Sequence, residues 1–404
     1  MPSQAHAFRL ASIALAAMLA QQLPACAEEN NADNTPAAQC RQATRLADAL
    51  AQQGKNKLAV EAYRSAADTF PDCSLPRSHA ASLFYDLSKN AEAEQAATLR
   101  QNARDKANRV LQTTPGDLLA HQVLRKLDFG EPQQRPIPAG PASQEFSMAE
   151  GLYGQERYDE AIEHYRKAIA IDPKFALAYV YLGDCYFSRK QYAEAAALYR
   201  QATQLDPLNG QAWRFLANAL LDEGKVEEVE DLLCQSIGAA PNDLYVWFYL
   251  QSYLDSMGVT LEPIDLRIHA YREAGEKTWT VDEQNEPAET AQNKEQPGAT
   301  LIWSANAMAH IEQARLHPEY SPFQLDFAAW QRTFEFAARS AKDGELKTVD
   351  PGLNHLYALN QAGLLKPALL LLAYREDYRP ELESWKKENP KGIREFVHKS
   401  GMRP

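Results

Sequence analysis

The sequence predicts an all-α protein, a solenoid of stacked helical hairpins followed by an additional helical domain. Three observations support this prediction. Similar segments recur every 34 residues and end on Pro173, Pro207 and Pro241, and a fixed period of this length is typical of stacked repeat architectures. Within each segment, apolar residues recur at intervals of three and four, as on one face of a helix. The last third of the chain keeps this spacing but loses the period.

The N-terminus has the pattern of a secretory signal. Arg9 precedes the apolar run LASIALAAMLA, which is shorter than the roughly 20 apolar residues of a spanning helix. Ala25 and Ala27 form a small-x-small site, so we expect residues 1–27 to be a signal peptide that is cleaved after Ala27. The segment LPAC also resembles a bacterial lipobox, in which case Cys26 would be lipidated; an uncleaved anchor is a third alternative. We therefore expect a periplasmic protein, free or lipid-anchored to a membrane facing the periplasm.

The repeat that ends at Pro207 shows why each period should fold as a hairpin. With Ala176 as position 1, large residues at positions 4, 7 and 11 lie on one face of a first helix. Small residues at 8, 20 and 27 allow a second helix to approach closely, and an aromatic residue at 24 fills the remaining gap. Proline at 32 stops the second helix. These residues are Tyr179, Leu182, Gly183, Tyr186, Ala195, Tyr199 and Ala202.

This pattern resembles the tetratricopeptide repeat (TPR) family. It recurs in the repeats that end at Pro173 and Pro241, so we expect Tyr165, Tyr199 and Leu233, all at position 24, to be buried equivalents. The same frame fits an N-terminal repeat ending at Pro71, and a longer degenerate helical pair follows it. The resemblance therefore covers roughly residues 38–258.

The remaining organisation follows from composition. A Pro- and Gly-rich stretch predicts an extended linker, and a stretch rich in Glu, Gln and Asn predicts a flexible segment. Helical patterns follow at residues 300–316, 323–342, 354–363, 366–375 and 379–399. The expected domains are a signal peptide at 1–27, degenerate N-terminal TPR-like hairpins at 38–128, the linker at 129–142, three TPR units with a capping helix at 143–258, the irregular segment at 259–300 and a helical C-terminal domain at 301–404.

Charge and motifs argue against several functions. The formal net charge is −12, whereas binding to nucleic acid or anionic membranes requires clustered Lys and Arg. The sequence carries no Gly-rich phosphate loop, nucleophile elbow or His-Glu-x-x-His motif. His310 and His317 lie seven residues apart, whereas helical zinc ligands are usually four apart. We expect no catalytic residues, metal site or cofactor.

The cysteines can be placed on the repeat. Cys40 and Cys73 occupy positions 1 and 34 of the N-terminal repeat, at the same open end of one hairpin, and we expect a disulfide between them. Such a bridge would contribute about 2–4 kcal/mol. Cys185 and Cys234 lie on helices that should not pack directly together, so we expect them to be unbridged and Cys185 to be a buried thiol.

The TPR resemblance implies a partner-binding surface on the inner face of the first helices. Positions 5, 9 and 12 of these helices should line a groove that suits a peptide segment or a helix of a protein partner. Arg214 and Asn218 resemble half of the carboxylate clamp of chaperone-binding members, but Glu150 and Asp184 would repel a carboxylate. The predicted groove residues are Phe146, Glu150, Tyr153, Val180, Asp184, Phe187, Arg214, Asn218, Leu221 and Phe248.

Three functions remain open. The first is a non-enzymatic scaffold or assembly factor of the bacterial envelope that binds a protein partner in the groove. The second is a periplasmic immunity or inhibitor protein that neutralises a toxic effector. The third is an enzyme whose site lies in the unrecognised C-terminal domain. A competing interpretation of the groove itself is that the C-terminal helices of the same chain fill it.

Overall fold

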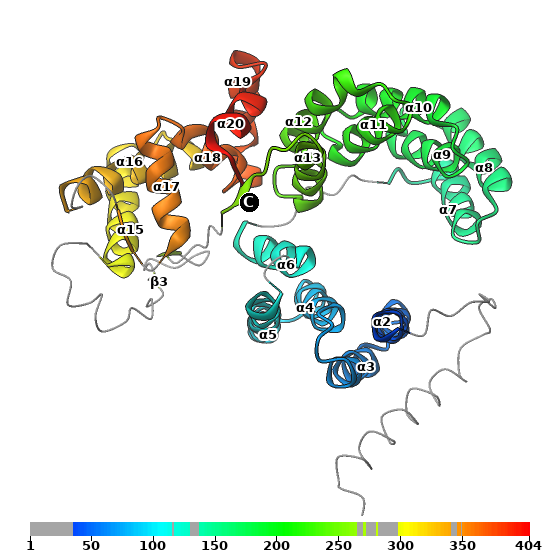
Figure 1. Cartoon of the computed structure of the whole chain (residues 1–404), viewed down its shortest axis with the longest axis horizontal. Helices are drawn as coiled ribbons and strands as arrows, with labels where there is room; N and C mark the ends of the chain where they lie inside the picture. The colour runs from blue at the N-terminus through cyan, green and yellow to red at the C-terminus, as the bar shows by residue number, and fades with distance from the viewer. Residues whose placement is uncertain are drawn as a thin grey trace, which may run out of the picture. The chain divides into compact units, whose positions relative to one another are not determined.

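A computed structural model describes residues 35–114, 117–129, 137–264, 270–271, 280–281, 298–340, 346–348 and 350–404. The expected signal peptide and Cys26 lie outside these residues. The chain divides into two compact units, residues 1–127 and 128–404. The described part of each unit is predominantly helical (Figure 1), which confirms the all-α prediction.

The N-terminal unit contains two helical layers of the expected kind. The N-terminal repeat forms a hairpin whose core includes Ala47, Leu50, Ala59 and Tyr63. A second core joins the helices that follow it, around Tyr85 and Val110. The helices are α2 (Pro36–Gln52), α3 (Asn56–Thr69), α4 (Leu75–Ser88), α5 (Ala93–Thr113) and α6 (Leu118–Phe129).

A disulfide joins the two ends of the N-terminal repeat. Cys40 on α2 and Cys73, in the turn after α3, have their Cα atoms 6.7 Å apart. This disulfide is the one predicted from positions 1 and 34 of the repeat. Arg77 reinforces the same turn, because its guanidinium donates to the carbonyl oxygens of Ala67, Pro71 and Cys73.

The C-terminal unit begins with the three consecutive repeats and the capping helix. Each repeat pairs a first helix with a second, antiparallel helix, and the second helix of the third repeat begins with a 3-10 turn. Tyr165, Tyr199 and Leu233 are all at least 98% buried, which confirms the position-24 prediction. The elements are α7 (Pro141–Tyr153), α8 (Tyr158–Ile171), α9 (Ala176–Ser188), α10 (Tyr192–Leu205), α11 (Gly210–Asp222), η1 (Val226–Glu228), α12 (Val229–Ala239) and α13 (Leu244–Ser256).

A repeated hydrogen bond explains the aromatic residue at position 4. Trp213 Nε1 donates to the carbonyl oxygen of Pro207 at 2.8 Å, and Trp247 Nε1 donates to that of Pro241 at 3.0 Å. The Tyr179 hydroxyl donates to the Pro173 carbonyl at 3.2 Å. A buried carbonyl without a hydrogen-bond partner destabilises the folded state, and the bond from Trp247 to Pro241 is buried. The aromatic residue thus both packs against the turn between repeats and satisfies its carbonyl.

The rest of the C-terminal unit is helical with short strands. β1 pairs in parallel with β4, and β2 pairs antiparallel with β3. Most of the expected flexible segment lies outside the described residues. The elements are β1 (Glu262–Pro263), β2 (Ala270–Tyr271), β3 (Thr280–Val281), α15 (Ala299–Leu316), α16 (Pro322–Ser340), α17 (Pro351–Gln361), α18 (Leu365–Leu371), η3 (Glu376–Tyr378), α19 (Arg379–Glu388), α20 (Gly392–Ser400) and β4 (Met402–Arg403).

Two expected boundaries are wrong. The pattern at residues 379–399 is not continuous: α19 ends at Glu388 and α20 starts at Gly392. Pro390 lies in the break, where the preceding Asn389 is disfavoured in a helical conformation. The pattern at 366–375 is helical only to Leu371, because its apolar residues continue into a buried turn that includes Leu372 and Tyr374.

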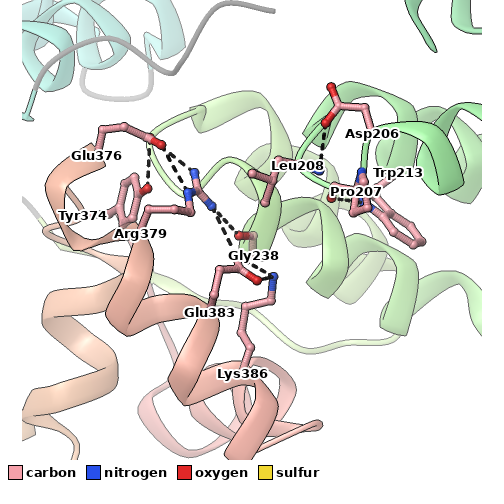
Figure 2. A network of polar contacts seen from close by, with 10 residues as sticks. All are labelled: Asp206, Pro207, Leu208, Trp213, Gly238, Tyr374, Glu376, Arg379, Glu383 and Lys386. Carbon is pink, nitrogen blue, oxygen red and sulfur yellow. Dashed lines mark hydrogen bonds and ion pairs between the residues drawn. The ribbon is translucent and has the colours of Figure 1, made fainter. Parts of the chain in front are cut away.

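The C-terminal helices dock on α12, the second helix of the third repeat. Arg379 Nη1 donates to the Gly238 carbonyl at 3.0 Å (Figure 2). Glu230 on α12 is paired with Arg394 at 2.9 Å and with His398 at 2.6 Å. A Cβ on Gly238 would lie 2.8 Å from Ile393 Cδ1. The glycine therefore permits the close approach of α20 to α12.

Figure 2 also shows how Arg379 is held. Its guanidinium pairs with Glu376 at 3.2 Å and Glu383 at 3.7 Å, and it lies 4.9 Å from the centre of the Tyr374 ring. Glu376 in turn accepts from the Tyr374 hydroxyl at 2.9 Å. The charge of Arg379 is thus compensated by carboxylates of its own segment.

The contact between paired helices can be tested at position 20 of the second repeat. Ala195 is completely buried between α9 and α10, so Ala195→Leu should lower the free energy of unfolding by about 1–3 kcal/mol through overpacking. Ala197→Leu on the exposed side of α10 is the matched control and should change it by less than about 0.5 kcal/mol. Urea titrations of the two variants measure the difference. Equal stabilities would contradict the packing described.

Candidate functional site

The face formed by the first helices α7, α9, α11 and α13 carries the ten residues predicted to line the groove. The prediction is wrong for two of them, because Phe146 and Val180 are buried in the core. Phe146 packs against the rings of Tyr165, Phe175 and Tyr181 at centroid distances of 5.0–5.7 Å. Two of these rings, Tyr165 and Phe175, belong to the repeat of Phe146, and Tyr181 belongs to the next repeat. The other eight residues are exposed or half-buried.

The α11–α13 end of this face is apolar and open. Leu221 is 42% exposed and Phe248 is 50% exposed. Tyr245, at position 2 of the capping helix, is 44% exposed, and Phe248 meets the ring of Tyr249 edge-on at 5.8 Å. Three large side chains of this face are thus exposed on α11 and α13.

The α7–α9 end contains carboxylates held by tyrosines. The Tyr199 hydroxyl donates to Asp184 Oδ1 at 2.6 Å, and the Tyr165 hydroxyl donates to Glu150 Oε1. The N-terminal repeat has the same pair, Tyr63 and Asp48. In all three, the acid is at position 9 and the tyrosine at position 24, fifteen residues later.

The third repeat lacks this hydrogen bond and both of its residue types. It has Asn218 at position 9 and Leu233 at position 24. The acid and the tyrosine are thus present together in three repeats and absent together in the fourth. The sequence contains this signal as an acid and a tyrosine fifteen residues apart in successive repeats.

Burial perturbs both carboxylates. It raises the pKa of Asp184 to about 6, although the hydrogen bond from Tyr199 and the positive charge of Arg214 act in the opposite direction. Burial also raises the pKa of Glu150, against the effect of the hydrogen bond from Tyr165. Desolvation disfavours the charged form of a carboxyl. The pKa of Asp184 remains below 7, so this carboxyl is mainly charged at neutral pH at some loss of stability.

Arg214 lies beside these carboxylates and is held by aromatic rings. Its guanidinium carbon lies 4.5 Å from the ring centres of Phe215 and Tyr249. Its Nε is buried without a hydrogen-bond partner. Cation–π contacts of this kind stabilise a guanidinium by about 0.5–2 kcal/mol. Arg214 therefore contributes to packing between α11 and α13 as well as to the charge of the face.

Aromatic pairs form one rim of the face. Tyr153 meets Tyr158 edge-on at 5.4 Å, and Phe187 meets Tyr192 in the same way at 5.2 Å. The equivalent positions are 12 and 17 of consecutive repeats. Each pair fixes the end of a first helix to the start of its second helix, and this leaves Tyr153 and Phe187 half-buried.

The hydrogen bonds and ion pairs that α19 and α20 form with the repeats involve the second helix α12. Arg379, Arg394 and His398 contact Gly238, Glu230 and Asp231, all on the second helix α12. Leu221, Tyr245 and Phe248 keep more than two-fifths of their surface exposed. The described C-terminal residues therefore leave the apolar end of the face accessible.

A second polar cluster lies among the C-terminal helices. Asp326 Oδ1 pairs with His310 Nε2 at 2.8 Å, and its Oδ2 accepts from Tyr378 and from Arg375 Nη1, the latter at 3.3 Å. Burial raises the pKa of Tyr378. Both carboxylate oxygens are engaged by neighbouring residues, so the cluster joins α15, α16 and η3. His317, the other histidine considered, pairs with Glu319 and stacks on Tyr320.

The remaining cysteines are reduced and buried. Cys185 and Cys234 are free, and burial raises the pKa of Cys185 to about 12. A thiol with such a pKa stays protonated and unreactive at neutral pH. No group of three or more His, Cys, Asp or Glu side chains suited to a metal ion occurs in the described part of the chain. Within the same residues, no helix is long and apolar enough to cross a membrane.

Family models described as "Tetratricopeptide repeat" match two regions of the chain. One model matches residues 44–115 and 146–209, and another matches residues 186–252. The chain therefore contains tetratricopeptide repeats in both units. No curated protein sequence matches the chain.

Several solved structures are similar to part of the chain. The first TPR of Spaghetti (RPAP3), bound to the HSP90 peptide SRMEEVD, is 22% identical, with 29% of this chain and 93% of that chain covered and a TM-score of 0.28. The Sgt2 TPR domain from Aspergillus fumigatus is 19% identical, with coverage of 35% and 97% and a TM-score of 0.28. MamA from Desulfovibrio magneticus RS-1 is 14% identical, with coverage of 50% and 94% and a TM-score of 0.24.

The burial of Asp184 predicts a specific pH dependence. Because folding raises its pKa from 3.8 to about 6, the folded state binds more protons than the unfolded state between these values. The contribution of Asp184 to the free energy of unfolding therefore falls as pH rises through this window. Asp184→Asn, which mimics the neutral form, should raise the free energy of unfolding at pH 7 by about 1–3 kcal/mol, and the gain should largely disappear at pH 4.

Urea titrations at the two pH values measure this effect. Asp159→Asn is the matched control, since Asp159 is exposed and pairs only with Arg189 among the described residues. It should change stability by less than about 0.5 kcal/mol at either pH. A less stable Asp184→Asn at pH 7 would show that attraction to Arg214 outweighs burial.

Proposed function

We propose that this chain is a protein-interaction scaffold that binds an extended segment of a partner protein along the first-helix face of its repeats. The observation that carries the proposal is the exposure of Leu221, Tyr245 and Phe248 on the first helices α11 and α13. Arg214 and the tyrosine-held carboxylates lie on the same series of first helices. Apolar anchors beside a few oriented polar groups are the usual composition of a specific binding surface. Aromatic residues and arginine also dominate binding energies at interfaces.

The scaffold is suited to this role because its binding residues are held by packing rather than by loops. Tyr153 and Phe187 are fixed by ring contacts within their own repeats. Arg214 is fixed by rings on α11 and α13. A surface that is ordered before binding loses less conformational entropy when the partner binds.

We further propose that the protein works in the bacterial envelope, exported by its N-terminal segment. The disulfide between Cys40 and Cys73 supports this proposal, because such bridges persist in oxidising compartments such as the periplasm. An assembly or scaffolding role there follows from the absence of recognised catalytic motifs in the sequence and from the open face of the repeats.

The binding role predicts that partner capture depends on the apolar end of the face. Leu221→Ala combined with Phe248→Ala should reduce capture of the partner from an envelope extract at least tenfold, as expected when two anchors are removed. Melting temperature should remain within a few degrees, because both side chains are largely exposed. Quantitative mass spectrometry of the captured proteins provides the measurement.

The control for this experiment uses equally exposed residues elsewhere. Ile171→Ala combined with Leu205→Ala changes side chains that are 50% and 41% exposed at the ends of the second helices α8 and α10. This variant should capture the partner as well as the unmodified protein does. If both double variants capture equally well, the first-helix face is not the binding surface.

Export can be tested independently. Protein produced in a Gram-negative host should be recovered from the periplasm with its N-terminus at Glu28, as cleavage after Ala27 requires. Intact mass of the mature chain decides this. A diacylglyceryl increment on Cys26 would instead demonstrate a lipoprotein, and recovery of the uncleaved chain in the cytoplasm would overturn the proposed location.

A further inference from the structure

Two partly buried carboxylates on the binding face lack a cationic partner within the described residues. Glu150 and Asp184 accept hydrogen bonds from Tyr165 and Tyr199, and no described Lys, Arg or His forms an ion pair with either. Arg214 influences Asp184 electrostatically, but its guanidinium is directed to the rings of Phe215 and Tyr249. Partly buried charges in proteins are normally paired.

The N-terminal repeat shows the same carboxylate with its charge compensated. Asp48 accepts from Tyr63 and also pairs with His79 Nδ1 at 2.8 Å. His79 lies 31 residues after Asp48, at the sixth position of the following frame. The residues at the same offset from Glu150 and Asp184 are Tyr181 and Phe215. The consecutive repeats therefore keep the tyrosine-held acid but replace the internal base by an aromatic ring.

Aromatic side chains lie near the two unpaired carboxylates: the ring of Tyr165, whose hydroxyl donates to Glu150, stacks on the ring of Tyr181 at 6.3 Å. The pKa of Tyr181 is raised by burial and by the charges of Glu150 and Asp184, and that of Tyr153 by burial and by the charge of Asp184. The phenols and the carboxylates therefore face a common region of α7 and α9. A guanidinium or ammonium group suits such a region, because it forms charge-assisted hydrogen bonds to carboxylates and stacks on aromatic faces.

We propose that the partner segment is basic, and that one of its arginine or lysine side chains lies against Glu150 and Asp184, beside the rings of Tyr153 and Tyr181. Apolar side chains of the same segment contact Leu221, Tyr245 and Phe248. The charge of Arg214, between these two regions of the face, confines the basic part of the segment to the α7–α9 end. This inference rests on the proposed function of the face and specifies the chemistry of its partner.

The test uses peptide libraries and the full mature chain. Four libraries of acetylated, amidated twelve-residue peptides carry a fixed central Arg, Lys, Gln or Glu, with flanking positions randomised among Leu, Phe, Ser and Gly. Peptides retained by the immobilised protein are identified and their Kd values measured by fluorescence anisotropy. The Arg- and Lys-centred libraries should be retained, and replacing the central residue of a selected peptide by Gln should weaken binding at least about tenfold.

Two double variants separate a local effect from a general effect of charge. Glu150→Gln combined with Asp184→Asn keeps an acceptor oxygen for each tyrosine. It should raise the Kd of Arg- and Lys-centred peptides about 30-fold or more, but the Kd of Gln-centred peptides less than about threefold. Asp159→Asn combined with Glu160→Gln removes the same charge from exposed positions on α8 and should leave all Kd values nearly unchanged. Thermal melts verify that both variants are folded.

Each outcome bears on the proposal. Retention of Glu- or Gln-centred peptides as strongly as basic ones, or equal affinity of the Glu150→Gln/Asp184→Asn variant and the unmodified protein, overturns the basic-segment inference. The retained Glu- or Gln-centred peptides would still support the first-helix face as a binding surface if Leu221→Ala combined with Phe248→Ala weakened their binding. Retention of no library overturns the inference, and the proposed function would then depend on the envelope-capture experiment alone.

Discussion

The side chain at position 24 of each repeat is the contact on which the repeat array depends. In the second repeat it is Tyr199, whose ring packs so closely on the first helix that a Cβ on Gly183 would lie 2.6 Å from it. The first and third repeats have Ala149 and Ala217 at that position, both fully buried. A second helix that carries a large ring can pack this closely on the first helix only where the residue facing the ring is very small. The same ring then covers the interface with the next repeat.

The position-24 contact also orders the carboxylates of the first-helix face. A tyrosine there extends its hydroxyl to the carboxylate at position 9, as Tyr165 does to Glu150 and Tyr199 to Asp184. The carboxylates are thereby ordered and partly removed from water, and burial raises their pKa values. Groups held in a charge state that burial disfavours are concentrated at functional sites. The side chain that packs the two helices of a hairpin together therefore also orients a carboxylate on the first-helix face, and no loop is needed for this.

The asymmetry between the two faces of the array follows from the docking of the C-terminal helices. Arg394 and His398 neutralise Glu230, and Gly238 allows α20 to approach α12. These contacts involve a second helix, whereas the apolar residues of α11 and α13 stay exposed. Had the C-terminal helices packed on the first helices, they would have excluded a partner. The observed arrangement uses the second helix α12 for internal packing and leaves Leu221, Tyr245 and Phe248 of the first helices exposed.

The sequence by itself determined the hairpins of the repeats, the burial of Tyr165, Tyr199 and Leu233, and which two cysteines share the end of one hairpin. These features are local and periodic, so each depends on residues within one repeat or its neighbour. Only the tertiary structure decided that Phe146 and Val180 are core residues. The rings that pack on Phe146 come both from its own repeat and from the next one, so its burial depends on how the repeats stack. It also decided where the C-terminal helices dock. Their contacts with α12 join residues more than 140 positions apart and follow no period, and long-range packing of that kind leaves no regular pattern in the chain.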